Sequence, residues 1–124
     1  MLKTRVKSLK FKMDYSQYLG KKITVVIDRP FGFIHPDYPE TVYPINYGYL
    51  PDTKAGNGEP VDVYVLGVDR ALPTFTGKCI AIIHRLDDNE DKLVLAPDGM
   101  DFSVEEIKKL IDFQEKYFKI EIIK

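Results

Sequence analysis

The chain has 124 residues, enough for one compact domain with a real core, since 44% of them are hydrophobic and 12% aromatic. Its 18 Lys and Arg residues nearly balance 19 Asp and Glu residues, so the formal net charge of −1 argues against bulk nucleic acid or an acidic membrane surface as the main partner. The single cysteine, Cys79, allows no disulfide within this sequence, which suits a reducing cytoplasm, and its apolar surroundings favour burial over a nucleophilic role.

The first residues differ from the rest of the chain. Residues 1–12 carry basic side chains and no acidic one, and we interpret them as a frayed extension that precedes a single domain over residues 13–124. The alternative is a basic arm that touches RNA or lipid. The sequence has no apolar run long enough for a signal peptide or a membrane span, so we expect no membrane partner.

Three strands are predicted in the first half of the chain, over residues 22–28, 47–49 and 61–68. The first is rich in β-branched residues, which favour strands. In the third, Val61, Val63 and Val65 fall on one face and Asp62 falls on the other. The stretch 31–46 between the first two is rich in proline, which predicts ordered loop with short edge pieces.

The second half predicts a hairpin and then a helix. Strands over 78–86 and 92–96 flank an acidic turn at residues 87–91, which indicates a β-hairpin. Ser103 with Glu106 three residues later is typical of a capping box, and it predicts a helix start. An inward, mostly apolar helical stripe follows, made of Ile107, Leu110, Ile111, Gln114, Tyr117 and Phe118.

Residues 120–123 are predicted as a last strand or a frayed tail. The order of elements, several short strands followed by one late helix, predicts a mainly β (α+β) fold. We expect a small closed β-barrel with a C-terminal α-helix packed against it. An open parallel sheet would need helical crossovers, which the first hundred residues do not offer.

Two acidic groups are candidates for metal binding. Glu59 and Asp62 flank a Pro-ended turn and the start of a valine-rich strand, where a carboxylate is costly to bury unless a cation offsets it. Ordinary solvated turn residues are an equally good interpretation of this pair. The acidic turn at residues 87–91 is, on its own, best explained as a soluble loop, but with Lys92 it could complete a site for cations and phosphate if it folds over the first group.

Three tyrosines stand close together in the sequence, at positions 43, 47 and 49. Tyrosine hydroxyls can donate to phosphate oxygens while the rings pack on the barrel. We favour packing for Tyr49, and for Tyr117, near the end of the predicted helix, packing and phosphate binding are equally supported.

The segment Tyr43-Pro-Ile-Asn-Tyr47-Gly-Tyr49 resembles the Tyr-Pro-x-Asn-Tyr-Gly segment of family I soluble inorganic pyrophosphatases. Residues 57–63, Asn-Gly-Glu-Pro-Val-Asp-Val, are similar to that family's signature Asp-x-Asp-Pro-x-Asp-Val. The acidic turn followed by Lys92 resembles the family's later acidic turn, and residues 113–119 resemble its late Tyr-Lys pair. These segments occur in the family's order from about residue 20 to residue 119, which makes the set more specific than any one piece.

The resemblance implies an OB-like barrel and Mg²⁺-dependent hydrolysis of pyrophosphate to two phosphates, with Mn²⁺ as the other candidate cation. It also makes a homo-oligomer plausible. The single cysteine and the near balance of charge lead us to expect a cytoplasmic location and no nucleic-acid partner. Carried over by position, the metal ligands would be Glu59, Asp62, Asp87 and Glu90. The catalytic residues would be Asp62, Lys92 and Tyr47, and the substrate-binding residues would be Tyr47, Lys92, Tyr117, Tyr43 and Arg29. Asp28 is similar in place to an upstream Glu of the family.

Departures from the family pattern favour an alternative. Asn57 stands where the signature has its first Asp, and Glu59 and Glu90 replace Asp residues. Fewer ligand charges would weaken metal binding, which suggests a degenerate relative that binds metal, phosphate or a nucleotide without useful turnover. A third hypothesis is an OB-type nucleic-acid binder that stacks bases on aromatics such as Phe31, Phe33 and Tyr43. It ranks last because acidic residues dominate the candidate site.

Overall fold

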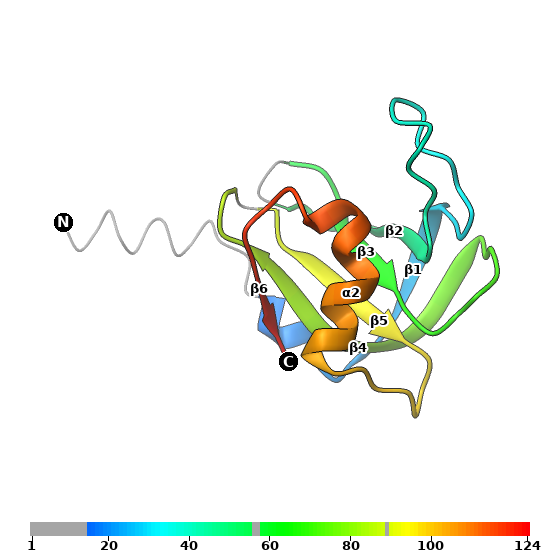
Figure 1. Cartoon of the computed structure of the whole chain (residues 1–124). Helices are drawn as coiled ribbons and strands as arrows, with labels where there is room; N and C mark the ends of the chain where they lie inside the picture. Colours follow the sequence, from blue (N-terminus) through cyan, green and yellow to red (C-terminus); the bar gives the residue numbers. More distant parts are fainter. Residues whose placement is uncertain (1–14, 56–57, 89) are drawn as a thin grey trace.

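The structure, a computed structural model, describes residues 15–55, 58–88 and 90–124. A short 3₁₀ turn, η1 (Tyr15–Tyr18), leads into the elements shown in Figure 1. These are the strands β1 (Lys22–Arg29), β2 (Asn46–Leu50), β3 (Val61–Val65), β4 (Thr74–Arg85) and β5 (Lys92–Ala96), the helix α2 (Val104–Glu115) and the strand β6 (Ile120–Ile123). The predicted basic extension over residues 1–12 lies outside the described residues, as do Asn57 and Asn89.

Five strands close into a β-barrel with an OB-like fold, as predicted. Their order is β1-β2-β3-β5-β4, and β4 pairs back with β1 to close the ring. All of these pairings are antiparallel except that of β3 with β5. The predicted hairpin of β4 and β5 is confirmed, with a register shift between Cys79 and Ala81. At 12 residues, β4 is long enough to pair with β1 near its start and with β6 near its end.

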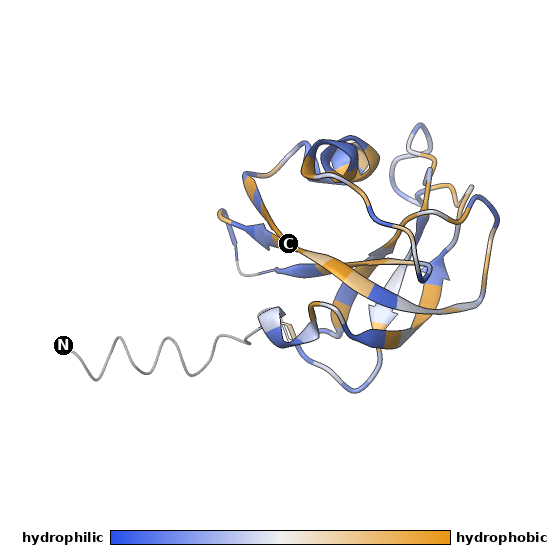
Figure 2. Ribbon diagram, turned by 90° about the horizontal axis from the view of Figure 1, so that it is seen from below, coloured by the Kyte–Doolittle hydropathy of each residue, from blue (hydrophilic) through white to orange (hydrophobic). Residues whose placement is uncertain are grey.

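The barrel wall separates two apolar clusters. The inner cluster includes Val61, Val63 and Val65, which are fully buried and occupy the face of β3 that the alternation predicted. The outer cluster includes Tyr64 and Leu66 from the opposite face of that chain segment, together with Ile107 and Ile111 of α2. The helix therefore covers one side of the barrel, as Figure 2 shows with α2 seen close to end-on. Among the described residues, no helix is long and apolar enough to cross a membrane.

The helix begins as predicted but ends earlier. Ser103 Oγ accepts from the Glu106 backbone N–H at 3.1 Å, and Glu106 Oε1 accepts from the Ser103 N–H at 2.8 Å, which is the predicted capping box. The last helical residue is Glu115, so the inward stripe does not extend to Tyr117, whose side chain is 73% exposed. The prediction that Tyr117 lies on the inward stripe is wrong, because the chain leaves the helix to pair β6 with β4.

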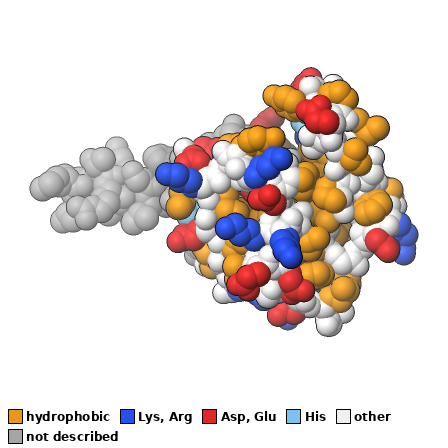
Figure 3. Space-filling model, viewed as in Figure 1, with side chains coloured by type: hydrophobic (Ala, Val, Ile, Leu, Met, Phe, Trp, Pro, Cys, Tyr) orange, Lys and Arg blue, Asp and Glu red, His pale blue; other side chains and the backbone are white. Residues whose placement is uncertain are grey.

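The loop between β1 and β2 protrudes from the barrel (Figure 1). It contains no regular strand but has one bridge, between Ile34 and Val42, in agreement with the predicted loop with edge pieces. Ile34, Tyr38 and Val42 are more than half exposed. Figure 3 shows hydrophobic side chains gathered on and beside this loop, whereas charges of both signs are mixed over α2.

Candidate functional site

A cavity of about 610 Å³ opens between the barrel wall, the protruding loop and the end of α2. Its lining is rich in charged and phenolic side chains. The described residues that line it are Asp28, Arg29, His35, Tyr38, Glu40, Thr41, Tyr47, Asp62, Arg85, Lys92, Phe113, Gln114, Tyr117 and Phe118. Three of the lining residues carry a positive charge, Arg29, Arg85 and Lys92, and three are carboxylates, Asp28, Glu40 and Asp62. The cavity could therefore bind an anion and a cation next to each other.

Lys92, the first residue of β5, lies at the buried side of this cavity and is only 3% exposed. Its Nζ donates to Tyr47 Oη at 2.7 Å and lies 3.8 Å from Asp62 Oδ2 and 3.5 Å from Glu115 Oε2. Burial lowers the pKa of Lys92, while the charges of Glu115 and Asp62 oppose the fall. The ammonium group is thus placed between two carboxylates and a phenol, at a wall of the cavity.

Tyr47 is held by its neighbours on β2. Burial, assisted by the charge of Asp62, raises the pKa of the Tyr47 hydroxyl well above its usual value. The hydroxyl accepts a hydrogen bond from Lys92 at 2.7 Å, and its contact with the Asp62 carboxylate adds to the rise in its pKa. The preceding residue, Asn46, is fully buried, and its side chain bonds Phe31 N and Arg70 O, each at 2.9 Å. Asn46 therefore fixes two loops against the strand that carries Tyr47.

Asp62 reaches the cavity from the outer face of β3, where its side chain is 35% exposed. Asp28, at the end of β1, lines the same cavity. β2 lies between these strands and pairs with both. Partial desolvation raises the pKa of Asp28, and the carboxylate of Asp62 adds to the rise. Two carboxylates that repel each other in this way favour a cation between them.

The arginine predicted to bind substrate, Arg29, is the last residue of β1 and lines the same cavity. Its NH1 donates to Tyr43 Oη at 2.6 Å, and that hydroxyl donates in turn to Gln114 Oε1 at 3.0 Å. The Tyr43 ring is 1% exposed and packs edge-on against Phe33 and Phe113. Tyr43 thus orients Arg29 and ties it to α2, while Arg29 itself faces the cavity.

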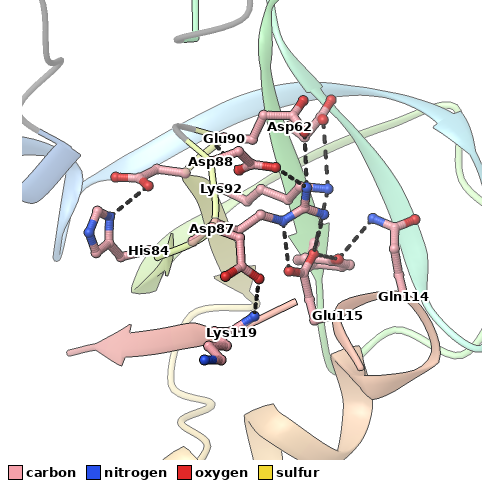
Figure 4. A network of polar contacts seen from close by, with 12 residues as sticks. Asp62, His84, Asp87, Asp88, Glu90, Lys92, Gln114, Glu115 and Lys119 are labelled. Atoms are coloured by element: carbon pink, nitrogen blue, oxygen red, sulfur yellow. Dashed lines mark hydrogen bonds and ion pairs between the residues drawn. The ribbon is translucent and has the colours of Figure 1, made fainter. Parts of the chain in front are cut away.

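A buried ionic cluster joins the end of α2 to the barrel (Figure 4). Arg85, at the end of β4, donates through Nε and NH2 to both carboxylate oxygens of Glu115, at 2.9 and 3.0 Å. Tyr64 Oη donates to the same carboxylate at 2.5 Å. Glu115 and Arg85 are 2% and 4% exposed. Burial alone would raise the pKa of Glu115, but the hydrogen bonds from Arg85 and the charge of Lys92 outweigh it and lower that pKa.

Sequence reasoning missed both Arg85 and Glu115. For Glu115 a signal was present, because it follows Ile107 and Ile111 at intervals of four and so lies on the buried face of the helix. A carboxylate at such a position needs a buried cation as partner. Arg85 stands near the end of a predicted strand, and nothing in its local sequence distinguishes it from a solvated residue.

The structure brings together five of the predicted site residues. Arg29, Tyr47, Asp62, Lys92 and Tyr117 all line the cavity, although they come from four strands and the segment after the helix. The remaining predicted site residues, Tyr43, Glu59, Asp87 and Glu90, are not among the described residues that line it. Their proposed functions, like those of the first five, stay predictions.

The partners of Tyr43, Asp87 and Glu90 lie in other parts of the structure. The Tyr43 hydroxyl bonds Arg29 and Gln114, as above. Asp87 Oδ2 accepts from the backbone N–H of Lys119 at 2.7 Å, and Glu90 Oε2 accepts from Arg85 NH1 at 2.9 Å.

The carboxylates that line the cavity could hold a hard divalent cation together with other oxygen ligands. Across the described ranges, no group of three or more His, Cys, Asp or Glu side chains could hold a metal ion. Asp62 and Asp28 supply carboxylate oxygens, and Mg²⁺ is commonly held by one or two carboxylates together with water and the phosphates of its substrate. The arrangement therefore suits a cation that the protein holds through one or two carboxylates and water, and that can also contact a phosphate.

Comparisons with known proteins point to one family. Residues 5–122 match the model of the family described as "Inorganic pyrophosphatase". The chain is 36% identical over 78 residues to the inorganic pyrophosphatase of Rickettsia prowazekii, a match that covers 59% of this chain and 45% of the relative. It is 35% identical over 82 residues to soluble inorganic pyrophosphatase 2 of Chlamydomonas reinhardtii, covering 60% and 43%. These matches thus span less than half the length of either relative.

Solved structures resemble the whole fold. An inorganic pyrophosphatase from Ehrlichia chaffeensis superposes with a TM-score of 0.62 at 22% identity, covering 83% of this chain and 85% of that one. One from Coxiella burnetii gives a TM-score of 0.61 at 18% identity, with 84% of each chain covered. At these identities the likeness supports the barrel fold alone, and it extends beyond the segment matched in sequence.

Proposed function

We propose that this chain, which belongs to the inorganic pyrophosphatase family, hydrolyses inorganic pyrophosphate to two phosphates with the help of a divalent cation. The observation that carries the proposal is the position of Lys92 Nζ, 2.7 Å from Tyr47 Oη and 3.8 Å from Asp62 Oδ2 in the wall of the cavity. A cation and a phenol that suit a phosphate group thus lie beside a carboxylate that suits a metal ion or a water molecule.

In this proposal the phosphates bind on the basic side of the cavity. Lys92 and Arg29 supply positive charge, and the hydroxyls of Tyr47 and Tyr117 donate to phosphate oxygens. Tyr117 is well exposed, so its hydroxyl can meet a ligand that enters from solvent. Tyr43 acts through Arg29, whose guanidinium it holds at 2.6 Å. Positive groups at these places offset the charge that develops on the leaving phosphate.

Asp62 would lie on the side of the bound phosphate that is opposite to Lys92 and Arg29. Its carboxylate would hold the divalent cation together with Asp28, and it would orient a water molecule toward the phosphorus atom. A bound divalent cation lowers the pKa of water and neutralises phosphate charge, which is the chemistry it supplies in such a site. We propose Mg²⁺ as this cation because the available ligands are hard oxygens, and Mn²⁺ is the second choice.

Glu59 and Asp87 stay predicted metal ligands, and neither lines the cavity in this structure. The predictions of a homo-oligomer and of a cytoplasmic location also stay predictions. The alternative, a relative that binds metal or phosphate without turnover, differs from the main proposal in one measurable property, the release of phosphate.

The test is phosphate release from pyrophosphate with Mg²⁺ or Mn²⁺, for the wild type, Asp62→Asn and Asp98→Asn. Asn has nearly the shape of Asp but lacks its charge, and Asp98 is a matched control because it pairs with Lys22 on the surface. We expect cation-dependent release by the wild type and the control, and a loss of about 100-fold or more in Asp62→Asn. No release from folded wild-type protein with either cation would refute the activity and favour the binding alternative.

A further inference from the structure

The acidic turn between β4 and β5 is bonded to an arginine of the same hairpin. Arg85 NH1 donates to Glu90 Oε2 at 2.9 Å and lies 3.4 Å from Asp88 Oδ2. Asp88 Oδ1 in turn accepts from the Glu90 backbone N–H at 2.9 Å, which holds the turn in shape around the guanidinium. The two carboxylates are therefore already paired with a positive charge from within the chain.

The other parts of the Arg85 guanidinium are also engaged. Nε and NH2 hold the Glu115 carboxylate, and the Phe118 ring covers a face of the guanidinium, with its centroid 3.7 Å from Cζ. Arg85 is 4% exposed. An ion that entered among Asp88, Glu90 and Glu115 would have to displace the guanidinium from its bidentate pair with Glu115, and the displaced buried charge would be left without its partner, which is unfavourable. This arrangement is therefore resistant to exchange with a dissolved cation.

The remaining described carboxylates of the turn have protein partners too. Asp87 Oδ2 accepts from Lys119 N at 2.7 Å, and Asp91 Oδ1 lies 2.8 Å from Nδ1 of His84 (Figure 4). Asp88 and Glu90 share Arg85 NH1, whereas Asp87 and Asp91 are directed to Lys119 and His84, so the four carboxylates do not converge on one point. This agrees with the absence of a three-ligand metal group among the described residues.

We propose that Arg85 is a built-in cation of the acidic turn, which takes the place that a divalent ion would have between Asp88, Glu90 and Glu115. Glu90 is then a partner of Arg85 and not a metal ligand, in contrast to the prediction from sequence. Divalent cations bind instead on the Asp62 side of the cavity. The chain thus neutralises this part of its site with a permanent charge, and Arg85 sets how many divalent ions it holds.

The first experiment measures Mn²⁺ bound per chain by equilibrium dialysis, without pyrophosphate, for the wild type and Glu90→Gln. We expect the wild type and Glu90→Gln to bind the same number of ions, with dissociation constants that agree within about twofold. The reason is that the Glu90 carboxylate is paired with Arg85 and does not hold a metal ion. Asp62→Asn is the comparison variant and should lose bound Mn²⁺, an expectation that rests on the proposed function. Loss of a bound ion in Glu90→Gln would overturn the proposal.

The second experiment removes the internal cation. Arg85→Gln should bind one more Mn²⁺ per chain than the wild type, whereas Arg85→Lys, which keeps the charge, should bind the same number as the wild type. Circular dichroism establishes that each variant is folded. A folded Arg85→Gln variant with no additional ion would overturn the proposal, and if that variant does not fold, the Glu90→Gln comparison decides alone.

These results are separate from those of the activity test. Mn²⁺ binding is measured with no substrate present, so a chain without pyrophosphatase activity can still confirm the role of Arg85. Conversely, if Arg85→Gln binds no additional ion, the proposal about Arg85 is refuted, but cation-dependent phosphate release by the wild type would still support the proposed function.

Discussion

Replacing Glu115 by Gln tests how much the buried ionic cluster contributes to stability. The change keeps the size of the side chain but removes its negative charge. In the wild type, Arg85 Nε lies 2.9 Å from Glu115 Oε1, and Lys92 Nζ lies 3.5 Å from Glu115 Oε2. Breaking a buried ion pair by removing one partner typically costs ~3–5 kcal/mol. We expect the lower end of this range, about 3 kcal/mol, because Arg85 keeps its hydrogen bond to Glu90. For a chain of this length, that loss corresponds to a fall in Tm of roughly 12 °C.

The assay is urea and thermal unfolding at pH 7, with Glu121→Gln as control, since Glu121 is exposed on β6. A loss below about 1 kcal/mol for Glu115→Gln would refute the reasoning and would mean that the cluster is easily replaced by neutral hydrogen bonds.

The same cluster predicts a pH dependence with a definite sign. The pKa of Glu115 is lowered in the folded protein, so its contribution to stability is present above the ordinary glutamate pKa of 4.5. That contribution is lost as the pH falls below this value and through the lower pKa of the folded state. The difference in unfolding free energy between wild type and Glu115→Gln should therefore shrink below pH 4.5.

Three further changes test the fold and the site. Gly48→Ala would place a Cβ 1.8 Å from the backbone oxygen of Val26 in the neighbouring strand, so we expect a loss of about 3 kcal/mol in urea unfolding. Ser103→Ala removes the cap of α2 and should cost about 1 kcal/mol in the same measurement. Tyr47→Phe removes the acceptor of the Lys92 hydrogen bond, and we expect roughly tenfold weaker pyrophosphate binding by calorimetry. Unchanged affinity in that variant would contradict the phosphate-binding role of the hydroxyl.

Much of the barrel could be predicted because its signals are local. The alternation of Val61, Val63 and Val65 specifies which face of β3 packs in the inner cluster, and it holds in the structure. The capping box of Ser103 and Glu106 likewise involves residues three apart. Strand ends were less accurate: β4 begins at Thr74 and not near residue 78, because its first part is stabilised by pairing with the distant strand β1.

The candidate site was predictable in part. The ordered motif segments identified Tyr47, Asp62 and Lys92, which the structure brings to one cavity. The exposure of Tyr117 could not be predicted, because the helix ends where β6 begins to pair with β4, and that pairing is a tertiary contact.

The sequence by itself therefore determined the class of fold and the residue types that meet in the cavity. Only the tertiary structure decided which charges are paired. Glu115 and Arg85 are 30 residues apart in sequence and form a bidentate pair only because α2 packs against the barrel. Which charges pair depends on their distance in space and on whether they are buried together, and local sequence encodes neither. From sequence alone, the carboxylates of the acidic turn could equally have bound a metal ion or an arginine.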